Sequence, residues 1–434
     1  MYINVLRVRL ELSLMGPVGL VFCNSDSCTF KRNLGANIGA FNYITASIQT
    51  YTYKKNRLNG SLLFHYYISI SEPRIPDNTE EIFQRTVQMR QACASIPPIR
   101  HLSGKLNSYR LFYVAEKYKL SYCRVAKAGS TFMAQLFMTL AGIDPKFHDY
   151  GNAQTMFELP KDLTHKAMKR NSALSMFIDD KRVQLTTSFI LARNPYSRLF
   201  SSYIDQIYLP NRWPETSHMV SDSKRKECGN DVTFNEFLAH IADSMLTKKS
   251  VEIHWAPIFT LCLPCETHID IVAKQESFVE DIDFILGYSG VEPEVRELIN
   301  MAASANILIS EIPDKIQALV KKGQSINRGC MSEQDLARRI WTAFQIQGHI
   351  RNEDSFPVYK FENILHDELE ETLVPLIEEA VVKMSLTPRQ IASQRHNWQL
   401  KFWKDISSET LRNIQAAYYE DFSLFGYNID PNKM

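Results

Sequence analysis

The stretch YCRVAKAGSTF, residues 122–132, joins a short β-prone run to an apolar helical segment through a tight turn. Free N–H groups at the start of a helix, together with the helix dipole, form a site for a phosphate or a similar oxyanion. Gly129 lets the backbone approach such a ligand closely, and Lys127 adds a positive charge. Ser130 and Thr131 can donate hydrogen bonds from their hydroxyl groups. The stretch therefore predicts an anion-binding loop, although a strand–turn–helix joint without a ligand would have the same local pattern.

A nucleoside-triphosphate P-loop is the obvious competing interpretation of this loop. That motif requires glycine, four residues and then Gly-Lys-Ser/Thr, so its lysine follows the loop. Here Lys127 precedes Gly129 by two positions. The register therefore excludes a Walker-type ATPase.

A second stretch, FILARNPYSRLFSSY at residues 189–203, predicts a buried strand followed by a helix that begins at its proline. Arg193 stands where the strand ends, and ligands of open α/β sheets bind outside such carboxyl ends. The planar guanidinium of Arg193 and the hydroxyl of Ser201 can together hold a second phosphate. Arg198 is expected to pair with a nearby carboxylate or helix end. Most isolated copies of such a pattern would nevertheless be structural.

Strand and helix signals alternate around the two stretches. β-prone runs lie at residues 111–115, 119–126, 186–192 and 269–274, and helical spacing at 79–93, 129–140, 195–208, 276–287 and 411–425. A capping box at residues 233–236 predicts the start of a further helix. Strand followed by helix, repeated, predicts an α/β domain with a parallel sheet.

The domain organisation follows from the flanking composition. Residues 1–78 contain aromatic, β-prone runs at 43–53 and 61–71 and end in a proline-containing linker, which predicts an N-terminal region or stem. Residues 79–430 are expected to form one domain. Within it, the segment 311–392 is predicted to be wholly helical and to form an insertion or cap. Its acidic charges are expected to form a solvated face.

Composition excludes several classes of protein. Hydrophobic residues make up 45% and charged residues 22% of the 434 residues, which excludes a mainly disordered chain, a collagen and a multi-span membrane protein. A formal net charge of +1 argues against a protein that coats nucleic acid. An anionic ligand must therefore be held locally.

The cysteines and the N-terminus leave the compartment open. Eight cysteines suit either an oxidised protein or a reduced enzyme, and the pair Cys262 and Cys265 is compatible with half a zinc site, with disulfides or with buried thiols. Residues 12–23 resemble a short signal-like apolar segment but are too short to span a membrane, and a buried segment is the alternative. Asn59 begins an N-glycosylation sequon.

Together the two stretches resemble the elements by which sulfotransferases bind the sulfuryl donor PAPS, phosphoadenosine phosphosulfate. The resemblance implies that the loop cradles the 5′-phosphosulfate and that Arg193 and Ser201 contact the 3′-phosphate. The loop residues implied in this role are Lys127, Ala128, Gly129, Ser130, Thr131 and Phe132.

Further matches resemble the Golgi carbohydrate sulfotransferases of the chondroitin and dermatan type, within sulfotransferase family 2. They are the HWAP and CLPC motifs at residues 254–257 and 262–265, and the segments 90–93, 270–276 and 421–427. The resemblance implies the PAPS-dependent sulfotransferase fold, a P-loop-like parallel sheet flanked by helices, with an added helical block. It also implies a glycan acceptor, a glycosaminoglycan or an N- or O-linked chain, no nucleic acid and no metal. The catalytic domain would then be lumenal, on a Golgi membrane reached through the N-terminus.

The chain also departs from the family pattern. Ala126 stands where family members usually have proline, and Phe132 and Met133 stand where a polar residue and tryptophan are frequent. Asn194 replaces the commoner aspartate. None of these departures removes Lys127, Arg193 or Ser201, so the expectation of donor binding is affected less than the identity of the acceptor.

The implied reaction is in-line transfer of a sulfuryl group to a sugar hydroxyl, which needs a base because the hydroxyl pKa lies far above neutrality. Lys127 is the predicted catalytic cation, placed to stabilise the leaving oxygen. His148, between the two PAPS elements, is the predicted base, with a structural role as the alternative. His254, beside Trp255, is the second candidate base but is expected to be a packed or hydrogen-bonded core residue. Glu276 has no assigned role.

Two rival functions remain open at this stage. The first is a non-catalytic paralogue that keeps the fold and binds glycan or nucleotide without turnover, a reading supported by Ala126, Phe132 and Met133. The second is an ATP-dependent, kinase-like enzyme that uses the same anion loop.

Overall fold

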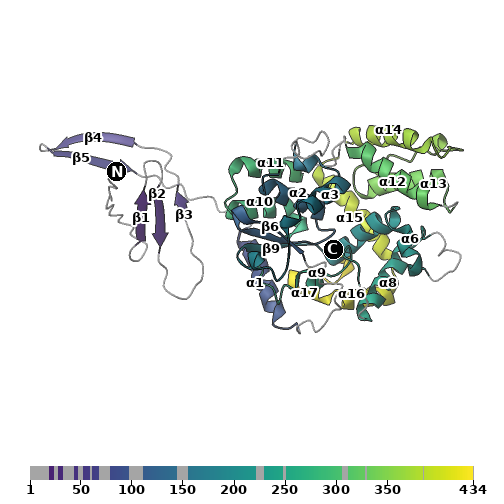
Figure 1. Ribbon diagram of the computed structural model, residues 1–434, viewed down its shortest axis with the longest axis horizontal. Helices are drawn as coiled ribbons and strands as arrows, with labels where there is room; N and C mark the ends of the chain where they lie inside the picture. The colour runs from purple at the N-terminus through teal and green to yellow at the C-terminus, as the bar shows by residue number, and fades with distance from the viewer. Residues whose placement is uncertain are drawn as a thin grey trace. The chain divides into compact units, whose positions relative to one another are not determined.

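The computed structural model describes residues 79–96, 111–143, 155–220, 229–247, 251–304, 311–327, 330–384 and 386–433, and the backbone of strands between residues 19 and 67. The chain divides into two compact units, Met1–Asp77 and Asn78–Met434 (Figure 1). Each unit is described by itself. The linker, the sequon at Asn59 and most of the signal-like segment at residues 12–23 lie outside the described residues.

The first unit is built from antiparallel strands. Strand β1 (Gly19–Cys23) pairs with β2 (Cys28–Arg32), which pairs with β3 (Ile44–Ala46), and β4 (Thr52–Leu58) pairs with β5 (Ser61–Tyr67). The β-prone runs at residues 43–53 and 61–71 therefore contain strands, as their composition predicts.

The second unit is organised around a five-stranded sheet in the order β10-β9-β7-β6-β8. The strands are β6 (Leu111–Ala115), β7 (Leu120–Cys123), β8 (Ser175–Phe177), β9 (Thr187–Ala192) and β10 (Ile271–Lys274). Strands β7, β9 and β10 run parallel to one another, which confirms the α/β class, but β6 is antiparallel to both β7 and β8. The predicted parallel sheet is therefore confirmed for β7, β9 and β10, and β6 adds two antiparallel pairs at one edge, because the short connection between β6 and β7 permits only an antiparallel pair.

Helices cover both faces of this sheet. On one face lie α2 (Ser130–Leu140), α3 (Lys161–Arg170), α10 (Phe278–Tyr288) and α11 (Pro293–Ser304), and on the other lie α1 (Thr79–Cys93) and α17 (Tyr419–Phe425) (Figure 1). The ring of Tyr122 on β7 packs among Tyr113, Phe137 and Phe189 in the buried core. Along α1, Ile82 and Met89 are buried, whereas Val87 is exposed.

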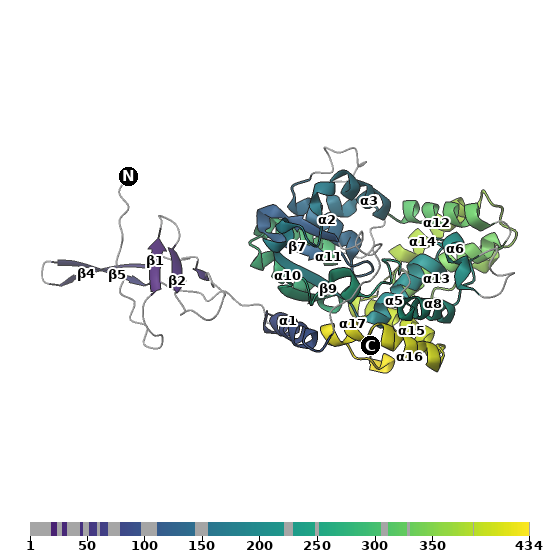
Figure 2. The same ribbon diagram turned by 60° about the horizontal axis from the view of Figure 1, so that its bottom comes forward.

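The rest of the second unit is helical, and Figure 2 shows α12, α13 and α14 grouped away from the sheet. The elements are α4 (Lys181–Gln184), α5 (Pro195–Tyr203), a π-helical turn (Ile204–Tyr208), α6 (Trp213–Thr216), α8 (Phe234–Leu246), α9 (Ile258–Cys262), α12 (Ile312–Asn327), α13 (Glu333–Ile346), α14 (Leu369–Val382), α15 (Pro388–Lys404) and α16 (Ser408–Ala417). The capping box at Thr233 is confirmed. None of the described helices is both long and apolar enough to cross a membrane.

Two of the helical predictions need correction. The segment 311–392 is not wholly helical, because turns and a short 3₁₀ helix (Val358–Lys360) separate α13 from α14. The predicted helix over residues 411–425 is broken at Tyr418 into α16 and α17. Its apolar stripe is nevertheless core, since Ile414, Tyr418 and Phe422 are buried.

Two disulfides hold the region around the end of α9. One joins the last residue of α9 to the end of β7, and the other joins the segment just after α9 to the end of α1. Cys123 is bonded to Cys262, and Cys93 to Cys265. Because each sulfur of the predicted zinc half-site is held in a disulfide, these two cysteines do not serve as metal ligands. The described residues contain no cluster of three or more His, Cys, Asp or Glu side chains suited to a metal ion.

Asp421 anchors α17 to α9 and carries a stability prediction. Its buried carboxylate accepts the N–H groups of Ile258 and Phe259, each at 2.8 Å. Replacing Asp421 by alanine is expected to lower the free energy of unfolding by about 2–4 kcal/mol, because two buried N–H groups lose their acceptor. Urea denaturation measures this change. The matched variant Glu409→Ala, on exposed α16 surface, is expected to stay within about 0.5 kcal/mol of the parent, and a similar loss in both variants would contradict the capping role.

Candidate active site

The predicted anion loop lies between β7 and α2 and has an unusual backbone. Lys127 and Gly129 both adopt positive φ, 64° and 72°, and such left-handed residues are typical of backbone concavities that bind anions. A Cβ atom added to Gly129 would lie 3.2 Å from Oε1 of Gln275 and 3.4 Å from the ring of Phe278. The tight packing of the 275–278 segment against the loop therefore requires glycine here.

The N-terminal turn of α2 presents unpaired backbone donors. The first helical hydrogen bond runs from the N–H of Met133 to the carbonyl of Gly129. Gly129 has no side chain to cap the helix, so the N–H groups of Ser130, Thr131 and Phe132 have no acceptor among the described residues. The side chain of Phe132 packs against Phe157 and Phe278, with ring centroids 5.0 and 5.1 Å apart. Phe132, and the fully buried Ala128, can therefore contact a ligand only through their backbone.

Lys127 is held by a carboxylate that the sequence did not single out. Its Nζ lies 2.7 Å from Oδ2 of Asp205, and Nζ of Lys161 lies 3.1 Å from the same oxygen. Burial and the neighbouring cations Lys161 and Arg193 lower the pKa of Lys127, against the opposing charge of Asp205. Burial alone would raise the pKa of Asp205, but Lys127 and Lys161 outweigh it and hold that pKa well below its usual range. Asp205 lies one helical turn after Ser201, and this spacing is the sequence signal that could have placed Asp205 at the site.

Arg193 brings the two predicted stretches into contact. It follows the last residue of β9, and its Nη1 donates to the main-chain carbonyl of Lys127 at 2.7 Å. Burial, with Arg395 and Arg198 nearby, lowers the pKa of Arg193 to about 10 although Glu276 opposes the shift, so the guanidinium stays charged at neutral pH. Ser201 is half-buried on α5.

Glu276 acquires a role that the sequence did not reveal. Its Oε1 accepts the N–H of Asn194 at 3.0 Å, and its Oε2 accepts the hydroxyl of Tyr427 at 2.9 Å. The side chain of Asn194 in turn accepts the N–H of Tyr196 and caps α5. Glu276 therefore positions the turn that carries Arg193.

The sequence predicted that Arg198 pairs with a carboxylate or a helix end, and this prediction is wrong. Its buried guanidinium donates to main-chain carbonyls of Ala126 at 2.9 Å, Ala256 at 2.6 Å and Ile253 at 3.4 Å. The reason is topological: β7, α5 and the 253–256 segment meet at this point. One guanidinium therefore ties the anion loop to the segment that contains His254.

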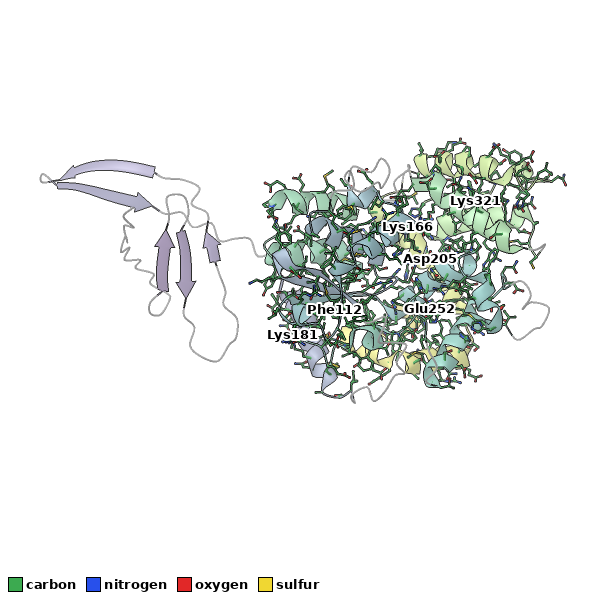
Figure 3. The ribbon with its side chains drawn as sticks, in the orientation of Figure 1. Phe112, Lys166, Lys181, Asp205, Glu252 and Lys321 are labelled. Carbon is green, nitrogen blue, oxygen red and sulfur yellow. A yellow bond between two sulfur atoms is a disulfide. The ribbon has the colours of Figure 1, made fainter. Side chains whose placement is uncertain are left out.

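His254 is hydrogen-bonded, as expected from the sequence, and its partner is the carboxylate of Glu252. Its Nδ1 lies 2.8 Å from Oε1 of Glu252, and Arg212 donates to the same oxygen at 2.9 Å. The side chain of His254 is 24% exposed. Burial lowers its pKa, and the nearby charge of Lys127 adds to this effect, against Glu252. Glu252 and Asp205 are labelled in Figure 3. The predicted base, His148, lies outside the described residues.

A cavity of about 200 Å³ borders this pair from the side of α6 and α8. Its lining includes Glu252, Arg212 and Trp255 but neither Lys127 nor Arg193. The anion loop therefore belongs to a different part of the surface.

The geometry is that of a candidate oxyanion-binding site at the carboxyl ends of parallel strands, the place where nucleotides bind in open α/β sheets. Residues 110–317 match the family described as Sulfotransferase family. This segment holds both PAPS-like stretches, and through it the chain is similar to the sulfotransferase family.

Carbohydrate sulfotransferases are among the curated proteins similar to this chain. Carbohydrate sulfotransferase 9 of Homo sapiens is 26% identical over 207 residues, 45% of this chain and 44% of that protein. Carbohydrate sulfotransferase 11 of Rattus norvegicus is 28% identical over 198 residues, 43% and 54% of the two chains. Carbohydrate sulfotransferase 10 of the same organism is 24% identical over 237 residues, 50% and 64%. The chain thus spans about half the length of the curated relatives it matches. No solved structure matches it significantly.

Proposed function

We propose that the protein transfers a sulfuryl group from PAPS to a hydroxyl group of a carbohydrate. The observation that carries this proposal is the hydrogen bond from Arg193 to the carbonyl of Lys127, which sets the two predicted phosphate-binding elements side by side. The family match over residues 110–317 and the carbohydrate sulfotransferases among the relatives support the same reaction.

The donor would use groups that have few or no protein partners. The N–H groups of Ser130 and Thr131, together with Lys127, suit the 5′-phosphosulfate, and Arg193 with Ser201 suits the 3′-phosphate. PAPS supplies the activated sulfuryl group when bound. Lys127 would exchange its contact with Asp205 for the leaving oxygen, while Lys161 remains to neutralise Asp205. A preorganised donor of this kind stabilises a transition state by roughly 3–4 kcal/mol.

We propose His254 as the group that accepts the proton of the acceptor hydroxyl, in place of His148. Glu252 fixes the His254 ring by accepting from Nδ1, which leaves Nε2 as the proton acceptor. Arg198 holds the backbone around His254 against the loop of Lys127. The lowered pKa of His254 keeps its imidazole neutral near pH 7, the state that a base requires.

This assignment predicts a change in the pH dependence of kcat/KM. Activity is expected to fall as the pH drops through the pKa of His254, because protonation removes the acceptor. Glu252→Gln is expected to move this acidic limb to lower pH, since the charge of Glu252 raises the pKa of His254 against burial. A pH–rate profile at saturating PAPS measures the shift. Unchanged activity in His254→Asn, with loss in His148→Asn, would return the role to His148.

The compartment and acceptor are parts of the same proposal. Two disulfides suit an oxidising compartment, which supports a catalytic domain in the Golgi lumen. Anchorage to the Golgi membrane through the N-terminus is part of this proposal. A glycosaminoglycan or an N- or O-linked chain is the proposed acceptor class.

Label transfer tests the function against its rivals. The purified chain, incubated with ³⁵S-labelled PAPS and a panel of desulfated glycans, is expected to label at least one of them. Binding of PAPS without transfer to any glycan would favour a non-catalytic paralogue. Turnover of ATP in place of PAPS would favour a kinase-like enzyme.

A further inference from the structure

Three basic side chains converge on the turn after α13. Nζ of Lys315, from α12, donates to the side-chain oxygen of Gln347 at 3.2 Å, and Nε of Arg395, from α15, donates to the main-chain oxygen of the same residue at 2.6 Å. His349 lies two residues further on, with its ring 5.7 Å from that of Phe344. Lys315 also lies over the Phe344 ring, 5.0 Å from its centroid. The three groups therefore form one cluster, here called the 315–349–395 cluster.

A glycine allows the cluster to close. Gly348 has φ +72°, and a Cβ atom added to it would lie 2.7 Å from Cγ2 of Ile391 and 3.1 Å from Nε of Arg395. The turn can therefore approach α15 this closely only without a side chain.

Among the described residues, no carboxylate is paired directly with the cluster, although the charges of Asp205 and Glu311 act on Lys315 from further away. Within the part of the chain that the structure describes, no carboxylate lies at ion-pair distance from Lys315, His349 or Arg395. Nδ1 of His349 is buried without a hydrogen-bond partner. Burial lowers the pKa of Lys315 to about 8, and burial with the charges of Lys315 and Arg395 holds that of His349 well below its usual range. Two neighbouring cations without a direct ion pair repel each other, so an anion bound between Lys315 and Arg395 would relieve this arrangement.

The 315–349–395 cluster lies near the proposed PAPS site around Lys127 and Arg193. Helix α15 contacts α5 through a 3.0 Å hydrogen bond from Ser197 to Gln399, one turn after Arg395. The charges of the cluster also reach the site, because Arg395 contributes to the lowered pKa of Arg193 and Asp205 acts on Lys315. His349 and Arg395 nevertheless lie outside the matched family segment, on the helical block.

We propose that Lys315, His349 and Arg395 form a subsite that binds an anionic group of the acceptor, the carboxylate or sulfate of an acidic sugar. The proposal rests on the proposed sulfuryl transfer and narrows its acceptor to acidic glycans. The two phosphate ends of PAPS already have hydrogen-bond donors of their own, in the loop of Lys127 and in Arg193. We therefore assign the 315–349–395 cluster to the second substrate, the glycan acceptor.

Isothermal titration of the full chain tests the subsite with two probes, the product nucleotide PAP and a chondroitin oligosaccharide. Lys315→Met and Arg395→Gln are each expected to weaken chondroitin binding by about ten-fold, the loss of one charge-assisted hydrogen bond. Their affinity for PAP is expected to stay within about two-fold of the parent. Lys321→Gln, which removes an exposed lysine on the same helix (Figure 3), is the matched control and is expected to change neither.

Lys315→Met also separates binding from folding. Lys315 is a partly buried cation without a direct ion pair, and its replacement by methionine is expected to leave the unfolding temperature unchanged or higher, so reduced glycan binding would not reflect unfolding. Weaker PAP binding with unchanged chondroitin binding would assign the cluster to the donor and overturn the proposal. Equal affinity of the parent for chondroitin and its carboxyl-reduced form would overturn it too. Failure of sulfuryl transfer itself is read separately, from label transfer by the parent chain.

Discussion

Replacing Lys127 by alanine is expected to lower kcat for sulfuryl transfer by about 10²–10³-fold. Lys127 is part of the anion loop itself, and its charge would act on the oxygen that leaves the sulfuryl group. Asp205 would still be paired with Lys161, so the variant creates no unneutralised buried carboxylate. Initial rates with saturating ³⁵S-labelled PAPS measure the loss.

A matched variant makes the Lys127 result specific. Lys161→Ala removes the other cation on Asp205, and it is expected to lower kcat by less than about ten-fold, because Lys127 continues to neutralise that carboxylate. If Lys127→Ala retained more than a tenth of the parent rate, Lys127 would not be the group that stabilises the leaving oxygen.

Replacing Arg193 by alanine is expected to weaken PAP binding by about 10²–10³-fold. The change removes a forked, charge-assisted contact to the 3′-phosphate and also the hydrogen bond to the carbonyl of Lys127. Arg193→Lys is expected to recover only part of the affinity, since an ammonium group lacks the planar fork. Titration with PAP measures both variants.

The control for Arg193 is an arginine of the same domain that faces solvent. Arg182→Ala removes a side chain paired with Asp180 on the surface, and its affinity for PAP is expected to match that of the parent. A loss confined to acceptor binding in Arg193→Ala would show that Arg193 does not hold the donor.

The local parts of the site could be predicted from sequence because short-range rules govern them. A glycine after a β-prone run, hydroxyl residues at a helix start and a proline after Arg193 each constrain the backbone within a few residues. The structure accordingly contains β7, α2, β9 and α5 close to their expected positions.

The remaining features depend on contacts between segments far apart in the chain. Neither the Arg198 carbonyl contacts nor the pairing of Cys123 with Cys262 has a signature in spacing. The pairing of His254 with Glu252 is local, but the sequence does not indicate that both side chains lie beside the loop of Lys127. The convergence of Lys315 and Arg395 likewise requires the packing of α12 and α15 around one turn.

A crystal structure of the full chain with bound PAP tests the central claim most directly. The account predicts one nucleotide that spans both elements, with its 5′-phosphate at the N–H groups of Ser130 and Thr131 and its 3′-phosphate at the guanidinium of Arg193. A nucleotide bound elsewhere, or one whose 3′-phosphate lies away from Arg193, would contradict the account.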